Sequence, residues 1–442
     1  MNSCLVLLPR LLVFAFVSLL VACSPEVSPT TGVGFKLGDV VPRINIQTEL
    51  DEQLLSHDRV NSKDTYVHAI MSIDGRDSYV DLDLTRIKIR SRGHSTFAQP
   101  KKSYKLKLPA KQSLFNLPAG KNWMLLANFQ DGPLMSNMLA MKAGDILNLP
   151  FTAVLIPVEV TVNNQYLGIY WLTPHKEVAP GRIDLGKQGL LLEFTHSKKY
   201  NSDPYNKNHY LFTTEGFKLP VLVHYPRLHK IAEKNLNTAN KKFKKISDDF
   251  NALEGELLAP DFLKKYGKQI DKESLAQLLI VYQLTYNQSL SQLESIYLHK
   301  KSGGKLTFGP IWDFDSAYGG SATREYFSHD VNADLLNDEQ VGAKFFQHFL
   351  KDPELHKIFK TEWEQFKKSG LNELKVFMKE YVNLLDSSGA YERDYSRWHK
   401  QQNAIKESPR KDLRAYEKGM GQWLDMRVLR IDAFVNEWKT DL

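Results

Sequence analysis

The most informative stretch of this 442-residue chain is Phe308-Gly309-Pro310-Ile311-Trp312-Asp313-Phe314-Asp315-Ser316-Ala317-Tyr318-Gly319. Two carboxylates stand there at positions i and i+2, and on an extended backbone such side chains point to one face. Asp313 and Asp315 would repel each other unless a cation lay between them, and hard divalent cations such as Mg²⁺ take oxygen ligands of this kind. The stretch therefore predicts a divalent metal site, and residues 308–319 are called the metal stretch below. The alternative is a strand end with one exposed acid and one helix cap.

A second informative stretch, residues 92–105, combines a turn with clustered cations. We call this stretch the signature and its first part, residues 92–98, the signature turn. It runs Arg92-Gly93-His94-Ser95-Thr96-Phe97-Ala98-Gln99-Pro100-Lys101-Lys102-Ser103-Tyr104-Lys105. Backbone N–H groups of a turn, together with Arg or Lys side chains, make an anion site, and polyphosphate is a natural ligand. The alternative is a polar hairpin with exposed lysines.

The N-terminus has the pattern of an export signal. Arg10 precedes an apolar run, 11–22, that is too short to span a membrane comfortably, and Cys23 follows at once. This predicts a signal peptide over 1–22, and it resembles a bacterial lipobox, in which Cys23 would be the lipidated first residue. Ser24 after the cysteine favours the outer membrane of a Gram-negative bacterium. The alternatives are a plain secretory signal and a helical anchor.

Cysteine content and net charge limit the possible partners. Of the 2 Cys, Cys4 would leave with the signal and Cys23 would carry lipid, so the core must be stable without disulfides. Loss of residues 1–22, which hold one Arg and no acid, lowers the formal net charge from +7 to +6. This modest excess, without a nucleic-acid motif, predicts no nucleic-acid partner.

The hydrophobic pattern divides the rest of the chain into two parts, after a polar tether over 23–39. Period-two alternation over 40–225 predicts a β-rich lobe, interrupted by one helix over 133–147. Helical spacing over 226–442 predicts a mostly helical lobe, in which 295–308 forms a hairpin before the metal stretch. The expected fold class is therefore α+β.

Individual elements follow from the same patterns. The predicted strands are 41–46, 66–73, 86–90, 104–108, 154–162, 166–172 and 190–194. The predicted helices of the second lobe are 271–286, with Asp271 as its N-cap, 345–368, 373–385 and 412–438.

The segments that carry chemistry resemble the CotH kinase family, the spore-coat-protein-H-like atypical kinases. Six segments match its motifs in order over about residues 40–435. They are Arg92-Gly93-His94-Ser95-Thr96; Pro100-Lys101-Lys102-Ser103-Tyr104; Trp123-Met124-Leu125-Leu126-Ala127-Asn128 with Asp131 and Asn137; Tyr166-Leu167-Gly168-Ile169-Tyr170-Trp171-Leu172; Leu191-Leu192-Glu193; and Gly309-Pro310-Ile311-Trp312-Asp313-Phe314-Asp315.

That resemblance implies an atypical protein-kinase-like fold that binds ATP with Mg²⁺ or Mn²⁺ and, in some members, phosphorylates proteins on Ser. Asp313 would be the metal-binding acid, the counterpart of the Asp in the kinase D-F-G motif, and Asp315 would support it. Lysines of the signature would approach the nucleotide phosphates, and an acid on the strand 190–194 would pair with one of them. The residues assigned to the nucleotide in this way are Arg92, Lys101, Lys102, Lys105 and Glu193.

The sequence departs from the family pattern where the catalytic Asp is expected. Family members carry this Asp just upstream of the W-D-F-D hairpin, but the window 287–297 has none, and Glu294 is its only acid. A kinase needs a carboxylate to orient the substrate hydroxyl and to accept its proton. Either Glu294 does this, one methylene longer, or the site does not turn over. Pro174 and Ser136 are further departures from the family pattern.

Two functions follow from these features. The first is a surface-tethered, CotH-like kinase that binds Mg-ATP and phosphorylates Ser or Thr of envelope proteins, anchored to the membrane by lipid. The second is a catalytically impaired, pseudokinase-type scaffold or interaction protein of the envelope. The acids of the metal stretch favour the first function, and the missing catalytic Asp favours the second.

Overall fold

The computed structural model describes residues 35–49, 65–93, 95–195, 210–319, 327, 330–403 and 412–438. The predicted signal peptide, Cys23 and most of the tether therefore lie outside the described residues. Strands dominate the first half of the chain and helices the second, so the predicted α+β class is confirmed. Among the described helices, none is both long enough and apolar enough to cross a membrane.

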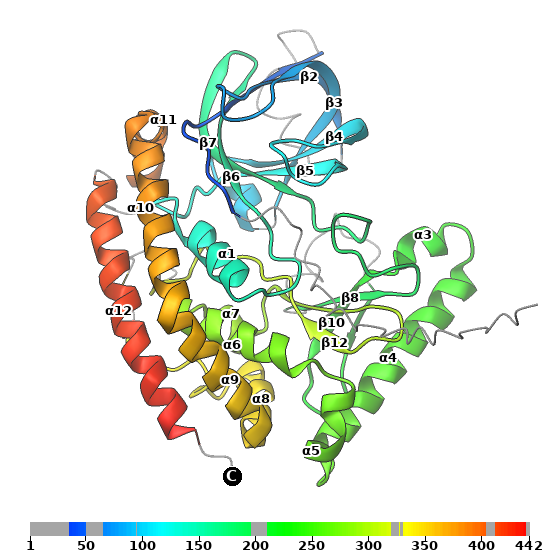
Figure 1. The fold of residues 1–442 in the computed structure, drawn as a ribbon. Coiled ribbons are helices and arrows are strands. Elements are labelled where there is room, and N and C mark those ends of the chain that lie inside the picture. The colour runs from blue at the N-terminus through cyan, green and yellow to red at the C-terminus, as the bar shows by residue number, and fades with distance from the viewer. Residues whose placement is uncertain are drawn as a thin grey trace, which may run out of the picture.

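The first half forms a closed barrel of seven strands (Figure 1). In spatial order they are β1 (Arg43–Thr48), β2 (Val67–Asp74), β3 (Leu82–Arg92), β4 (Ser103–Gln112), β5 (Gly120–Leu126), β7 (Gln165–Pro174) and β6 (Ile156–Val162). Neighbours are antiparallel except β1 and β6, whose parallel pairing closes the ring. Alternate residues such as Ile44, Ile87 and Leu106 fill the inside. The predicted strands of this region are confirmed, and β5 is an addition.

A second sheet joins strands from both halves, in the order β12-β11-β8-β10-β9. Its strands are β8 (Leu190–Phe194), β9 (Leu211–Thr213), β10 (Pro220–Tyr225), β11 (Ile296–Lys300) and β12 (Leu306–Phe308). The hairpin predicted before the metal stretch is formed by β11 and β12. Because β11 also pairs with β8, Tyr297 lies opposite Glu193.

Most helices lie below the barrel, α10 and α12 pack together along one edge, and α11 contacts β7 of the barrel (Figure 1). Those described are α1 (Ser136–Ile146), α3 (Leu228–Ala232), α4 (Leu236–Leu258), α5 (Phe262–Lys265), α6 (Lys272–Thr285), α7 (Ser289–Gln292), α8 (Val341–His348), α9 (Pro353–Gln365), α10 (Leu371–Ser387), α11 (Ala390–Asn403) and α12 (Leu413–Glu437). The buried helix α6 packs against α1, α9 and α12. Its predicted N-cap is confirmed, because Asp271 accepts a hydrogen bond from the Ser274 N–H at 2.9 Å.

The single helix predicted over 345–368 is wrong. The chain ends α8, turns at Asp352 and restarts as α9 at Pro353, where the Asp352 side chain accepts a hydrogen bond from the Glu354 N–H. Proline suits the first turn of a helix, where its missing N–H is not needed, but it breaks a helix interior. Asp352-Pro353 therefore marks the start of a new helix, which the continuous aromatic periodicity of 345–368 did not indicate.

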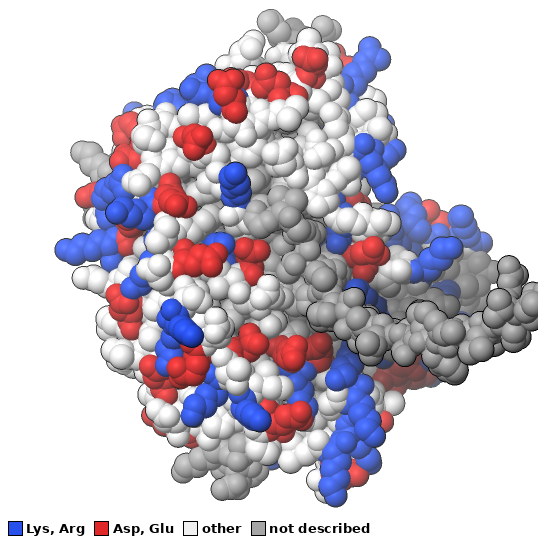
Figure 2. Space-filling model, in the orientation of Figure 1, with Lys and Arg blue, Asp and Glu red and all other residues white. Residues whose placement is uncertain are grey.

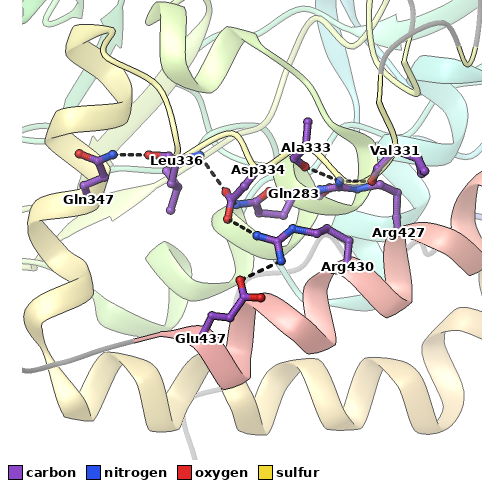
Figure 3. Close-up of polar contacts among 9 residues, drawn as sticks. All are labelled: Gln283, Val331, Ala333, Asp334, Leu336, Gln347, Arg427, Arg430 and Glu437. Carbon is purple, nitrogen blue, oxygen red and sulfur yellow. Dashed lines mark hydrogen bonds and ion pairs between the residues drawn. The ribbon is translucent and has the colours of Figure 1, made fainter.

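Arg427 of α12 fastens the C-terminal helix to the end of α6 and to the loop before α8 (Figure 3). Its fully buried guanidinium donates to the carbonyl oxygens of Gln283, Val331 and Ala333 at distances of 2.6–2.9 Å. The same loop is held by Asp334, which accepts a hydrogen bond from Gln283 Nε2 at 2.6 Å. This network fixes the end of α6, the helix that leads into the window 287–297.

Replacing Arg427 by Met should lower the free energy of unfolding by about 3 kcal/mol or more, because several buried carbonyl oxygens lose their donors. Met keeps an unbranched apolar stem but lacks the guanidinium, so the change removes the hydrogen bonds together with the volume of that group. Thermal unfolding would detect this as a lower Tm. The matched control, Arg414→Met, alters an exposed arginine of the same helix and should leave Tm nearly unchanged. Equal Tm values for the two variants would contradict the anchoring role.

Candidate functional site

A cleft lies where the barrel, α1 and the second sheet meet. It brings together segments that are far apart in the sequence. Its lining includes Arg92, Gly93 and Thr96 of the signature turn, residues 126–130, Asn137 of α1, Glu294 and Ser295 of the window, and Trp312, Asp313 and Asp315 of the metal stretch. The two acids of the metal stretch thus share one cleft with the signature turn.

Asp313 presents an exposed carboxylate to the cleft. Its backbone φ is +70°, a conformation that Asp and Asn adopt more readily than other side-chain-bearing residues. The Asn287 side chain donates to the Asp313 carbonyl oxygen at 3.1 Å, and Ser295 Oγ donates to Oδ2 at 3.4 Å. The window 287–297 therefore holds the backbone of Asp313 while its carboxylate stays open to a ligand.

Asp315 lies deeper and is tied to α1. The Asn137 side chain donates to its carboxylate, and Oδ1 of the same amide accepts a hydrogen bond from the Phe314 N–H at 2.8 Å. Burial, followed by the charges of Asp313 and Asp131, raises the pKa of Asp315 to about 8. A group of acids that disfavour each other's ionisation is a place where a bound cation is stabilising.

The donor set fits a hard divalent cation. In phosphate-binding sites, Mg²⁺ uses one or two carboxylates and fills its remaining positions with water and substrate phosphates. Asp313 and Asp315 supply two such acids. Within the part of the chain that the structure describes, no three His, Cys, Asp or Glu side chains gather into a complete metal site. A cation held here would take its remaining oxygen ligands from water, amide groups or substrate phosphates.

In the metal-free protein, Asp315 should make stability fall as the pH rises from about 4 to about 8. The unfolded residue ionises near the lower value and the folded residue near the upper one, so the folded state binds more protons in between. In EDTA, the Tm of the wild type should fall by about 2 °C or more beyond that of Asp315→Asn across this range. Parallel curves for the two proteins would contradict a protonated, buried Asp315.

The window 287–297 carries Glu294 into the cleft. It forms α7 and then a turn, in which the Glu294 N–H donates to the Ser289 carbonyl oxygen at 3.0 Å. Leu293 and Ser295 on either side have positive φ, which fixes the direction of the turn. Glu294 is half-buried and lines the same cleft as Asp313. The acid of the window 287–297 and the acids of the metal stretch therefore share one cleft.

Comparison with known protein families covers every segment of this cleft. The family model described as CotH kinase protein matches residues 89–418. The chain belongs to the CotH kinase family. The family predicted from the six motifs is confirmed, and most of α12, with Arg427, lies beyond the matched range. A search among curated proteins gave no match.

The signature turn of the CotH family contributes a cation and a required glycine to the cleft. Burial lowers the pKa of Arg92, and the charges of Asp313 and Asp315 oppose this change, so its guanidinium faces the acids. Gly93 has a φ of +112°, and a Cβ at this position would meet Thr96 Oγ1 at 2.1 Å. Glycine is the residue that tolerates both constraints. His94 lies outside the described residues.

The first of the predicted CotH lysines, Lys101, is buried at the edge of the cleft. Its Nζ lies 2.6 Å from Asp394 Oδ1 of α11 and 2.6 Å from the carbonyl oxygen of Ile169 in β7. This ion pair, with both partners almost fully buried, connects the barrel to the helices. Lys101 therefore has a structural contact in addition to its place in the lining of the cleft.

The other two predicted lysines point elsewhere. Lys102 donates to the carbonyl oxygen of Phe97 at 2.6 Å, within the signature turn. Lys105 Nζ lies 3.1 Å from His175 Nε2. Neither residue lines the cleft, so among the described signature lysines it is Lys101 that reaches it.

A lysine that the sequence analysis did not select, Lys176, also lines the cleft. Its Nζ donates to Tyr297 Oη at 2.6 Å and lies 3.9 and 4.0 Å from the ring centres of Tyr297 and Trp312. Glu193, opposite Tyr297 in the sheet, forms an ion pair with His224 at 2.5 Å. Burial disfavours its charge, but His224, Lys176 and Tyr297 together lower the pKa of Glu193. The predicted acid of β8 therefore interacts electrostatically with Lys176. The two residues come together because β8 pairs with β11.

Proposed function

We propose that this CotH-family protein is a phosphotransferase that binds ATP with Mg²⁺ or Mn²⁺ in the cleft and phosphorylates Ser or Thr of a protein. The supporting observation is that one cleft joins the acids of the metal stretch, the cations Arg92 and Lys176, and Glu294. Phosphoryl transfer depends on positioning and on charge stabilisation, for which these groups are suited. We infer further that the barrel and the helices serve as the two lobes of an atypical protein-kinase-like fold.

Acids and cations of the cleft would have separate roles in the binding of Mg-ATP. Asp313 and Asp315 would hold the cation, which when bound neutralises charge on the phosphate oxygens. Arg92 and Lys176 would donate hydrogen bonds to those oxygens, since charge-assisted contacts of this kind are short and strong. Glu193 positions Lys176 through Tyr297.

Glu294 would be the general base of the transfer. It accepts the proton of the substrate hydroxyl while that oxygen forms a bond to the γ-phosphorus. The bond between the γ-phosphorus and its bridging oxygen breaks, and ADP leaves with the electron pair. Asn287 belongs to the same window as Glu294 and donates a hydrogen bond to the Asp313 backbone, so it would fix the position of Asp313 relative to Glu294.

A second candidate function is a pseudokinase-type scaffold of the envelope that binds nucleotide without turnover. The observation that favours it is the window 287–297, which offers Glu294 but no Asp to a substrate hydroxyl. In that case the cleft would serve to order the protein around a nucleotide, and interaction with a partner would be its output.

Calorimetry of ATP binding to the purified chain, with and without Mg²⁺ or Mn²⁺, tests the proposal. We expect binding that requires the metal, followed by transfer of labelled phosphate to a protein substrate. Metal-dependent binding without any transfer would favour the scaffold. No binding with either metal would overturn the nucleotide site.

We also propose that residues 1–22 are removed on export and that lipidated Cys23, followed by the tether over 23–39, holds the protein at the outer membrane. This would place its protein substrate in the cell envelope. The support is the sequence pattern alone. Cys23→Ser should move the protein from the membrane fraction to the soluble fraction, and continued attachment of the variant would refute the anchor.

A further inference from the structure

We propose that a cationic cluster beside the cleft binds acidic segments of the protein substrate, an inference that rests on the proposed kinase function. The cationic cluster consists of Arg90, Lys105, His175 and Arg227. None of its members lines the cleft. They adjoin it, because Arg90 lies two residues before Arg92 and His175 directly precedes Lys176.

The cluster is built on the outer surface of the barrel. Arg90 of β3 lies opposite Lys105 of β4, and Lys105 Nζ contacts His175 Nε2 at 3.1 Å. Their strand neighbours Ile89 and Leu106 fill the barrel, so alternation turns Arg90 and Lys105 outward. Arg227, directly before α3, completes the cluster with a side chain that is 53% exposed.

Positive charge in the cluster is only partly compensated. Glu177 pairs with Arg227 at 3.5 Å, and its negative charge also raises the pKa of Lys105. Burial, then the charge of Arg90, nevertheless lowers the pKa of Lys105 to about 8, and Arg227 adds to this effect. Burial and Lys105 hold the pKa of His175 far below its usual range, so this residue is neutral. Bringing an anion to the cluster would relieve this repulsion.

Two buried nitrogens of the cluster support a ligand-binding role. Arg90 Nε and His175 Nδ1 are shielded from solvent and have no hydrogen-bond partner within the described part of the chain. Buried polar atoms are normally paired, so each of these two nitrogens calls for a partner such as a bound water or a ligand group. An acceptor oxygen beside Arg90 would satisfy one of them.

The nucleotide is a poor candidate for that ligand. Its phosphates would lie in the cleft, next to Arg92 and Lys176, and would leave the cluster uncompensated. Beyond Arg227, Figure 2 shows Lys and Arg side chains near α3, mixed with acids, and Lys230 there pairs with Glu233 at 2.7 Å. The partly compensated charge of the cluster itself, with Arg227 exposed at its rim, is complementary to Asp or Glu side chains that flank a substrate Ser.

Fluorescence anisotropy with labelled Ser peptides tests this inference without turnover. Peptides flanked by Glu should bind roughly tenfold more tightly than peptides flanked by Gln, and the preference should weaken as salt is added. Arg227→Glu should remove most of the preference, while Arg414→Glu, the matched change at another exposed arginine paired with an acid, should preserve it. Equal affinity for all peptides would overturn the inference.

Calorimetry with Mg-ATP separates the peptide from the nucleotide. The affinity of Arg227→Glu for Mg-ATP should equal that of the wild type. A variant that loses nucleotide affinity but keeps its peptide preference would assign the cluster to the nucleotide and refute the inference. Absence of phosphoryl transfer in the wild type would count against the proposed function alone, because peptide affinity is measured independently.

Discussion

Asp313→Asn should abolish Mg²⁺-dependent ATP binding and leave the fold intact. The loss of affinity should be at least about 100-fold, since even outer-shell changes at metal sites cost 10–100-fold. The fold should survive because the Asp313 carboxylate is exposed and accepts a long hydrogen bond, of 3.4 Å, from Ser295 Oγ. The Asn287 amide holds the backbone carbonyl, which the substitution preserves. Asn also tolerates the positive φ at this position.

Calorimetry with Mg²⁺ and with Mn²⁺ measures the effect, and Tm without metal monitors the fold. The matched control is Asp248→Asn, which removes an acid from an exposed pair with Lys244 on α4 and should keep full nucleotide affinity. If Asp313→Asn bound Mg-ATP like the wild type, Asp313 would have no place in the metal site. A large drop in its metal-free Tm would instead show a structural role.

Local patterns predicted the elements whose partners are close in sequence. Period-two alternation identified β3 and β4 as strands, because a strand has the same period wherever it lies. The hairpin of β11 and β12 and the cap at Asp271 are likewise local. Closure of the barrel by β1 and β6 and the pairing of β8 with β11 were not predictable in this way, since they join distant segments.

The candidate site shows the same division. Asp313, Asp315 and Arg92 were selected because their motifs are contiguous, and the fold does bring them to one cleft. Lys176 was missed, because its importance arises from Tyr297, which only the second sheet places beside it. Lys105 shows the opposite case. Its motif selected it for the nucleotide site, but it does not line the cleft. Lys105 follows the buried Tyr104 in β4, and strand alternation turns it to the outer face of the barrel.

Glu294→Gln should reduce phosphoryl transfer by about 10²–10⁴-fold, the usual contribution of a general base, and leave the affinity for Mg-ATP nearly unchanged. The amide is the same size as the carboxylate but cannot accept the hydroxyl proton. The Glu294 N–H bond to Ser289, which shapes the turn, does not involve the side chain and is preserved. Transfer of labelled phosphate and calorimetry together separate the chemical step from nucleotide binding.

Two further variants show whether position or charge matters at this turn. Glu294→Asp withdraws the carboxylate by one methylene, so it should give intermediate transfer rates if the longer side chain replaces an Asp that other family members use. Glu339→Gln, at a 94% exposed acid, should behave like the wild type. Full transfer by Glu294→Gln would remove Glu294 from the mechanism. A wild type that binds Mg-ATP but never transfers phosphate would mean that this CotH-family cleft, with its metal acids in place, has kept nucleotide binding without the base that turnover requires.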